Sequence, residues 1–270
     1  MKTIKRIAVA TDFSDNARIA YKYGKALAKL MNVEFTLIHI YASPLGLQSG
    51  NSADLNLSID ERAKKTLTRL RRFANDKSVN CAVHIGSPAE KLTELSQNGL
   101  FDLLIIGVRG ERGLFEKLFG SVALSLMKHA FCPVLLLPKS AKIPESISNI
   151  VYATSELSSD NDGISTITDW AQTLNATIHF VHVNRPGYND KMTDISALMA
   201  DSNAKYIVKE LEYISVRGAI DSYCEKQPID IMVSMTHNYS LWNSFFHNSI
   251  TESLAWNNPM PLLVLHKKSE

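Results

Sequence analysis

The sequence has little cysteine and no long apolar run, and both absences narrow the class of protein. Its 270 residues include three cysteines, Cys81, Cys132 and Cys224. Their wide, unpaired spacing argues against a disulfide framework and a zinc site, and it favours a reducing cytoplasm. No stretch approaches the roughly 20 apolar residues that a membrane-spanning helix needs. The opening MKTIKRIAVATDF has too short an apolar run for a signal peptide, so we expect a first strand in a cytoplasmic protein.

An excess of charge of one sign is missing as well. The chain has 29 Lys and Arg against 27 Asp and Glu, a formal net charge of +2. This balance gives no electrostatic reason to expect nucleic acid or an anionic membrane as a partner. A Walker-type Gly-Lys-Ser/Thr is also absent, which excludes the P-loop of kinases and GTPases. The composition, 45% hydrophobic and 21% charged, is that of a globular protein with enough apolar material for two cores.

Four apolar runs of the first half recur in the same order in the second half. The matched pairs are 7–12 with 150–155, 35–40 with 178–183, 102–105 with 230–233, and 133–137 with 261–265. The offset is 143 residues for the first two pairs and 128 for the last two. The second copy is therefore 15 residues shorter between its second and third matched runs. We predict two homologous domains, at residues 1–142 and 146–270.

Within the first copy, short apolar runs alternate with helical segments. Strands are expected near 4–11, 33–41, 79–85, 102–107 and 133–138. Ser14, Ser58 and Ser87 are placed to cap the helices between them, the last two in capping boxes, with Pro88 opening the third helix and Gly99 closing it. Strands that alternate with helices pair in parallel and are covered on both faces. The predicted fold class is α/β, with two tandem doubly wound (Rossmann-like) domains, each a five-stranded mostly parallel sheet flanked by helices.

Glycines and an aspartate gather where such sheets bind ligands, at the carboxyl ends of the strands. Asp12 follows the first strand, and Gly107 and Gly110 follow the fourth. Glycine has no Cβ, so these two positions allow a positive φ and a close approach of the backbone to a ligand. Nine residues later, Gly120 and Ser121 open the last helix, whose unpaired N–H groups attract an anion. A lone glycine pair would more often just end a strand, but the whole set favours a phosphate cradle.

The first copy resembles the universal stress protein family, and the whole chain resembles a tandem pair of such domains. The spacing Gly107-x2-Gly110-x9-Gly120-Ser121 matches that family's ATP-binding signature without a gap, and Ala10-Thr11-Asp12 also fits the family pattern. The resemblance implies ATP, ADP or AMP as the ligand, with Mg²⁺ held through the phosphates and no separate metal site. The implied nucleotide-binding residues are Thr11, Asp12, Ile40, Gly107, Arg109, Gly110, Gly120, Ser121 and Val122. Arg109 occupies a variable position of the signature, where it contacts either phosphate or solvent.

The second copy lacks most of this cradle. The counterparts of Gly107, Gly110, Gly120 and Asp12 are Met235, Asn238, Asn248 and Ser155, and Ser249 alone is retained. A side chain at each former glycine blocks backbone approach, and we expect Met235 to project bulk into the cradle. Glu252 would also repel phosphate. We therefore predict a nucleotide site in the N-terminal domain only. The aromatic-rich loop 238–246 either binds a partner or apolar ligand, or covers the core or the contact between the domains.

These patterns favour an ATP-binding regulatory protein of the stress response, with no dedicated catalytic residues and slow hydrolysis at most. His39 and His182 sit at equivalent strand positions, which indicates structural roles. The alternative is a nucleotide-independent interaction or scaffold protein that acts through the second domain. An adenylating enzyme is disfavoured because no added substrate domain is present. The resemblance further implies that the closing strands, 133–138 and 261–266, pair the two copies as an internal pseudo-dimer, and that two chains can form a homodimer.

Overall fold

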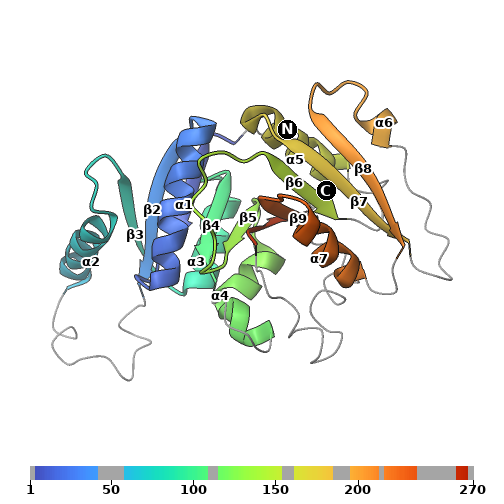
Figure 1. Cartoon of the computed structure of the whole chain (residues 1–270). Coiled ribbons are helices and arrows are strands. Elements are labelled where there is room, and N and C mark those ends of the chain that lie inside the picture. Colours follow the sequence, from blue (N-terminus) through green and yellow to red (C-terminus); the bar gives the residue numbers. More distant parts are fainter. Residues whose placement is uncertain are drawn as a thin grey trace.

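The computed structural model describes residues 4–41, 58–108, 115–153, 161–184, 195–212, 216–235 and 260–266. Within these ranges the strands form one ten-stranded sheet in the order β3-β2-β1-β4-β5-β10-β9-β6-β7-β8, with helices packed against it (Figure 1). The first half of the chain supplies the first five strands of this order and the second half supplies the other five. The α/β fold class predicted from the sequence is therefore confirmed.

The first half follows the predicted alternation of strands and helices. Its elements are β1 (Arg6–Ala10), α1 (Asp15–Met31), β2 (Glu34–Tyr41), α2 (Ile59–Ala74), β3 (Asn80–Ile85), α3 (Pro88–Gln97), β4 (Leu103–Gly107), α4 (Phe115–His129) and β5 (Val134–Leu137). All of its neighbouring strands pair in parallel. Each strand lies where the sequence predicted it, within one or two residues at either end.

The second half repeats this order with one helix reduced. Its elements are β6 (Asn149–Ala153), α5 (Asn161–Leu174), β7 (Thr177–Asn184), α6 (Ile195–Leu198), β8 (Lys205–Glu212), α7 (Val216–Lys226), β9 (Ile231–Met235) and β10 (Leu262–Leu265). Its strands are also parallel to one another. The 16-residue α2 has as its counterpart the four-residue α6, and this difference accounts for most of the shortening of the second copy.

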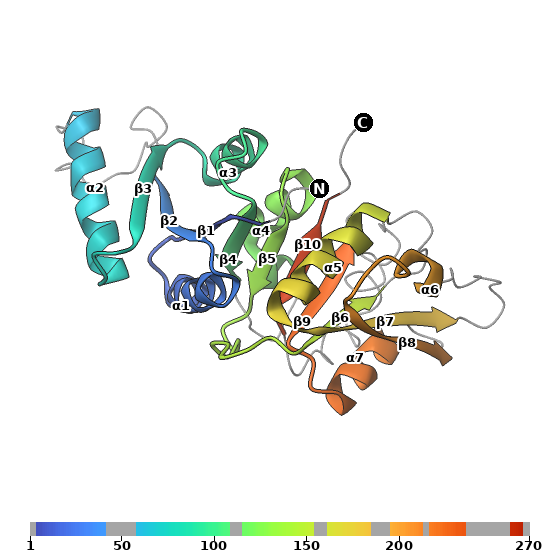
Figure 2. The ribbon, with the colours of Figure 1, turned by 90° about the horizontal axis from the view of Figure 1, so that it is seen from above.

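The two halves join through their closing strands. β5 and β10 pair antiparallel at the middle of the sheet, with Leu135 opposite Leu263, while β3 and β8 form its two outer edges (Figure 2). Just after β10, the Nε2 of His266 lies 3.1 Å from the carbonyl oxygens of both Leu126 and Met127, in the last turn of α4. Because a carbonyl only accepts, this nitrogen carries the proton. The domain boundaries at 142 and 146 stay a prediction.

Two apolar cores lie on opposite faces of the sheet, and both run through the two halves. Residues of α1, α2, α5 and α6 pack in one core, and residues of α3, α4 and α7 in the other. β4, β5, β9 and β10 are buried along almost their whole length, as expected for parallel strands covered on both faces. Continuous apolar runs in the sequence were thus a sound guide to the middle of the sheet.

Two of the three predicted helix caps are present. The Oγ of Ser14 accepts a hydrogen bond from the N–H of Ala17 (3.2 Å), and Ser58 and Glu61 form the complete capping box. The third capping box is wrong: Ser87 is the N-cap residue of α3, but its side chain makes no capping hydrogen bond. Ser87 is exposed, so water can satisfy the first N–H groups of this helix instead.

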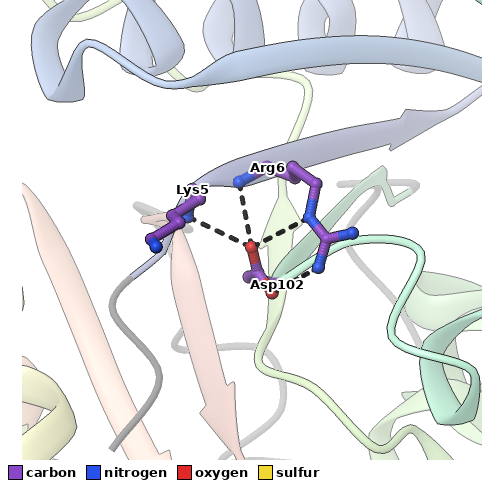
Figure 3. A network of polar contacts seen from close by, with 3 residues as sticks. All are labelled: Lys5, Arg6 and Asp102. Atoms are coloured by element: carbon purple, nitrogen blue, oxygen red, sulfur yellow. Dashed lines mark hydrogen bonds and ion pairs between the residues drawn. The ribbon is translucent and has the colours of Figure 1, made fainter.

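A buried aspartate anchors the start of the central strands. The Oδ2 of Asp102 accepts hydrogen bonds from the backbone N–H groups of Lys5 (3.1 Å) and Arg6 (3.0 Å), and its Oδ1 accepts one from the Arg6 guanidinium (3.0 Å) (Figure 3). The pKa of Arg6 is raised, chiefly by this hydrogen bond. Asp230 repeats the arrangement in the second half, with its Oδ2 accepting from the N–H groups of Ser148 (2.7 Å) and Asn149 (2.9 Å). In the first half, the Asp102 carboxylate fixes the amino end of β1 against β4. This end of the sheet is opposite to the end where a ligand would bind.

Candidate functional site

A cavity of about 750 Å³ opens at the carboxyl ends of β1, β2 and β4. This volume is in the range of small-molecule sites. Seven of the nine predicted contact residues line it: Thr11, Asp12, Ile40, Gly107, Gly120, Ser121 and Val122. The other two, Arg109 and Gly110, lie outside the described residues. The sequence pattern missed the contributions of α1 and α3, which add Asn16, Pro88 and Leu92 to the lining.

Asp12 is held in a tight turn between β1 and α1. Its Oδ1 accepts a hydrogen bond from the N–H of Ser14 (2.9 Å), and the Oγ1 of Thr11 accepts one from the N–H of Phe13 (3.0 Å). The N–H of Thr11 donates to the Ile38 carbonyl (2.9 Å), which ties the turn to β2. The second carboxylate oxygen of Asp12 has no partner among the described residues, so it is available to a donor group in the cavity.

Gly107 serves a different purpose from the one predicted. Its φ does not lie in the left-handed region, and it ends β4 as an extended residue in register with Leu137. A Cβ at this position would overlap the carbonyl oxygen of Asn16, and it would lie 2.6 Å from that carbonyl carbon and 3.0 Å from the nitrogen of Ala17. The expectation of a positive φ here is therefore wrong. Glycine is needed because the first turn of α1 packs directly on the end of β4.

Gly120 has the conformation that the cradle requires. Its φ of 58° and ψ of 162° interrupt α4, and such a backbone is almost restricted to glycine. No atom of the described residues lies within 4 Å of a Cβ at Gly120, so among these residues the need for glycine comes from conformation and not from space. The helix resumes at Ser121 and runs to His129, and Ser121, Val122 and Ala123 line the cavity. N–H groups in the first turn of a helix have no intrahelical acceptor, so they are donors for an anion.

The described lining carries little formal charge. Among the described lining residues, Asp12 is the only aspartate, glutamate, lysine or arginine. Ala10, Ile40, Leu92 and Ile106 form an apolar part of the lining. Attraction for a phosphate therefore comes from the backbone at the start of the resumed helix rather than from basic side chains in this part of the lining. An apolar floor beside one carboxylate and a helix start suits a ligand that combines a flat ring, hydroxyl groups and an anion.

His39 also lines the cavity, and it contacts the turn that carries Asp12. Its Nδ1 lies 2.6 Å from the Thr11 carbonyl oxygen, and because that oxygen only accepts, Nδ1 is the protonated nitrogen. Burial lowers the pKa of His39, so this neutral tautomer is favoured. Its counterpart His182 is buried too, but the Nε2 of His182 has no hydrogen-bond partner within the described ranges.

In the second half, Met235 occupies the position of Gly107 and is 3% exposed. Its side chain packs in the core against α5, where a Cβ on Gly163 would lie 2.8 Å from its sulfur and 3.0 Å from the Tyr152 hydroxyl. The bulk predicted for the cradle is thus packed in the core beneath α5, next to Gly163. Asn238, Asn248, Ser249, Ser155 and the aromatic loop 238–246 lie outside the described residues.

Other kinds of site find no support in the described part of the chain. No cluster of three or more His, Cys, Asp or Glu side chains there could hold a metal ion. No helix in the same ranges has both the length and the apolar character needed to cross a bilayer. The three cysteines, all in the described ranges, form no disulfide, and burial raises the pKa of Cys224 to about 12, which leaves its thiol unreactive at neutral pH.

Comparison with known proteins agrees with this geometry. The model of the universal stress protein family matches residues 3–138. Universal stress protein MJ0531 of Methanocaldococcus jannaschii is 32% identical over 143 residues, which cover 51% of this chain and 84% of that protein. The crystal structure of a universal stress protein from Archaeoglobus fulgidus covers 97% of this chain and 98% of its own, with a TM-score of 0.71 and 18% identity, and so shows the fold along the full length.

A further solved relative carries a nucleotide. The universal stress protein family protein At3g01520 from Arabidopsis thaliana was crystallised with AMP bound; it is 20% identical and covers 51% of this chain and 93% of its own, with a TM-score of 0.36. The bound AMP is a property of that protein. The family match covers half of the present chain, including β1 to β5 and the described lining of the cavity. The chain belongs to the universal stress protein family.

Proposed function

We propose that the cavity of the first half binds an adenine nucleotide, and that this binding gives the protein a regulatory role in a stress response. The observation that carries the proposal is the convergence of three separate segments on one cavity: the Asp12 turn, the end of β4 and the break in α4 at Gly120. Such a site has the parts that a nucleotide needs, an apolar floor, a carboxylate and a helix start. The stress-response role follows from the family.

Each part would act on a different group of the nucleotide. The N–H groups from Ser121 onward, with the Ser121 hydroxyl, would hold the phosphate nearest the sugar. The free carboxylate oxygen of Asp12 would accept hydrogen bonds from ribose hydroxyls. Ile40 and its apolar neighbours would lie against the base. Mg²⁺ would be held by the outer phosphates of ATP and by Asp12, and it would supply charge neutralisation there.

We place this function in the first half alone. The conformation of Gly120 and the close packing at Gly107 belong to the first half. In the second half a buried Met235 replaces Gly107 and asparagines replace the other two glycines. One nucleotide per chain is the expected stoichiometry.

Calorimetry with AMP, ADP and ATP, each with and without Mg²⁺, tests the proposal directly. The matched pair Gly120→Ala and Gly99→Ala separates binding from folding, because both glycines have a positive φ (58° and 63°) and Gly99 does not line the cavity. We expect similar losses of stability for the two variants and a loss of nucleotide binding for Gly120→Ala alone. A wild-type protein that binds none of the three nucleotides at millimolar concentration would refute the proposal.

A nucleotide-independent interaction through the second half is the second candidate. It is favoured by β8, an outer edge strand whose Tyr206 and Ile207 are 36% and 40% exposed. Exposed apolar residues on an unpaired strand are a common place for another chain to add. Failure of nucleotide binding in the calorimetry above, together with association that is lost on Ile207→Lys, would favour this candidate.

A further inference from the structure

The turn that carries Asp12 contains an unusual backbone conformation. Phe13 has a φ of 67°, in the left-handed region that bulky residues avoid. The other described non-glycine residues with a positive φ are asparagines, which tolerate this region: Asn32 and Asn75 are C-caps, and Asn175 follows the last residue of α5. Phe13 has no such role, since it precedes a helix. A strained residue of this kind persists only where its surroundings hold it.

Three side chains and one hydrogen bond hold Phe13 in place. Its N–H donates to the Oγ1 of Thr11 (3.0 Å). Its ring centroid lies 4.4 Å from that of His39 and 5.6 Å from that of Phe73, the latter edge-on. The Arg69 guanidinium lies over the Phe13 ring, 4.0 Å from its centroid. We call His39, Arg69 and Phe73 the Phe13 bracket.

The bracket connects α2 to the cavity. Arg69 and Phe73 belong to α2, which contributes no residue to the described lining. Asp12 and Ser14, the residues on either side of Phe13, both line the cavity and are hydrogen-bonded to each other. The left-handed Phe13 lies between these two lining residues, and its half-buried ring packs against Arg69 and Phe73 of α2.

We infer that Phe13 and its bracket are positioning residues for the nucleotide, an inference that rests on the function proposed above. α2 clamps the Phe13 ring, the ring holds the strained backbone, and the strained backbone sets the Asp12 carboxylate. α2 is then part of the nucleotide site, although it touches no ligand. Preorganisation of this kind lowers the cost of binding without adding a contact.

The second half retains one residue of this set, His182, and lacks the others. The position of Phe13 holds Glu156, and α2 is reduced to the four-residue α6. His182, the counterpart of His39, is buried with an unpartnered Nε2 among the described residues. The ring of Phe13, the long α2 and the three glycines are therefore present together in one half and replaced together in the other, as expected if they serve one ligand.

The test is a double-mutant cycle with AMP as the probe, using Phe13→Asn and Asp12→Ala. Asparagine accepts a left-handed φ, so Phe13→Asn removes the ring and keeps the turn accessible. We expect Phe13→Asn alone to weaken AMP binding at least tenfold. In the Asp12→Ala background, the same change should cost less than twofold, because the carboxylate it positions is gone. A loss that adds in full to that of Asp12→Ala, or no loss at all, would overturn the inference.

Arg69→Met is a second test of the same inference, and it can be used if the Phe13→Asn variant fails to fold. It removes the cation above the ring and keeps an unbranched apolar stem. Its matched control is Arg72→Met, at an exposed position of the same helix and outside the Phe13 bracket. We expect AMP binding about threefold weaker for Arg69→Met and unchanged for Arg72→Met, the size of a partly exposed cation–π contact. Equal affinities for both variants would refute the role of the bracket. Absence of AMP binding by the wild type would instead refute the proposed function itself.

Discussion

Gly107→Ala probes the contact between the end of β4 and the start of α1. The added methyl would meet backbone atoms only, with Asn16 and Ala17 of α1 on the receiving side, and backbone cannot turn away as a side chain can. Overpacking of this kind costs about 1–3 kcal/mol, and the unyielding neighbours place it near the upper end. Removing a glycine from a strand returns roughly 0.5–1 kcal/mol. We therefore expect a net loss of about 2 kcal/mol, or a fall in Tm of about 4–8 °C for a chain of this size.

The internal repeat offers a matched control. Gly163→Ala in the second half brings its methyl against the sulfur of Met235 and the hydroxyl of Tyr152, both at the ends of side chains. Because the thioether can change rotamer, we expect less than about 1 kcal/mol of destabilisation. Thermal unfolding followed by far-UV circular dichroism measures both variants, and calorimetry should show weaker AMP binding for Gly107→Ala alone. A Gly107→Ala protein as stable as the wild type, or less affected than Gly163→Ala, would refute the reasoning.

Three further predictions concern stability, pH and turnover. Asp102→Ala leaves two backbone N–H groups and a guanidinium without their acceptor, so urea unfolding should show a free energy of unfolding lower by about 3 kcal/mol. Asp230→Ala leaves only two backbone N–H groups without an acceptor, so its loss should be smaller. Burial lowers the folded-state pKa of His266, so the unfolded chain takes up the proton first as the pH falls below about 6.5. The urea midpoint should therefore drop between pH 7 and 5, and drop less in His266→Phe; equal slopes would contradict this. A phosphate-release assay with Mg·ATP should detect slow hydrolysis at most, and turnover near 1–10 s⁻¹ would show a dedicated enzyme.

Local signals predicted the fold well because strands and helix starts are written in neighbouring residues. The repeat of apolar runs located all four matched strand pairs, and Ser14 and Ser58 cap the helices they were expected to cap. Ser87 occupies the N-cap position of α3, but its side chain makes no capping hydrogen bond. The sequence placed the 15-residue difference between the second and third matched runs, but it did not show that a helix is shortened there.

The site was predicted less completely, because its details depend on contacts between distant segments. Glycine at position 107 was identified, but its reason lies across the sheet at Asn16, so the expected positive φ was wrong. Phe13 gave no signal, because the residues that contact its ring, in α2 and β2, lie far from it in the sequence. The nucleotide contacts of Arg109 and Gly110 stay predictions.

The antiparallel pairing of β5 with β10 has a consequence for how the two halves can change. In a symmetric dimer of identical chains, every substitution appears on both sides of the interface at once. Here each side of the interface has its own stretch of sequence. A substitution in one half therefore leaves the residues of the other half unchanged. The different glycine positions, Gly107 beneath α1 in one half and Gly163 in α5 in the other, record that independence. Covalent joining thus lets the residues of the two halves differ while β5 and β10 stay paired.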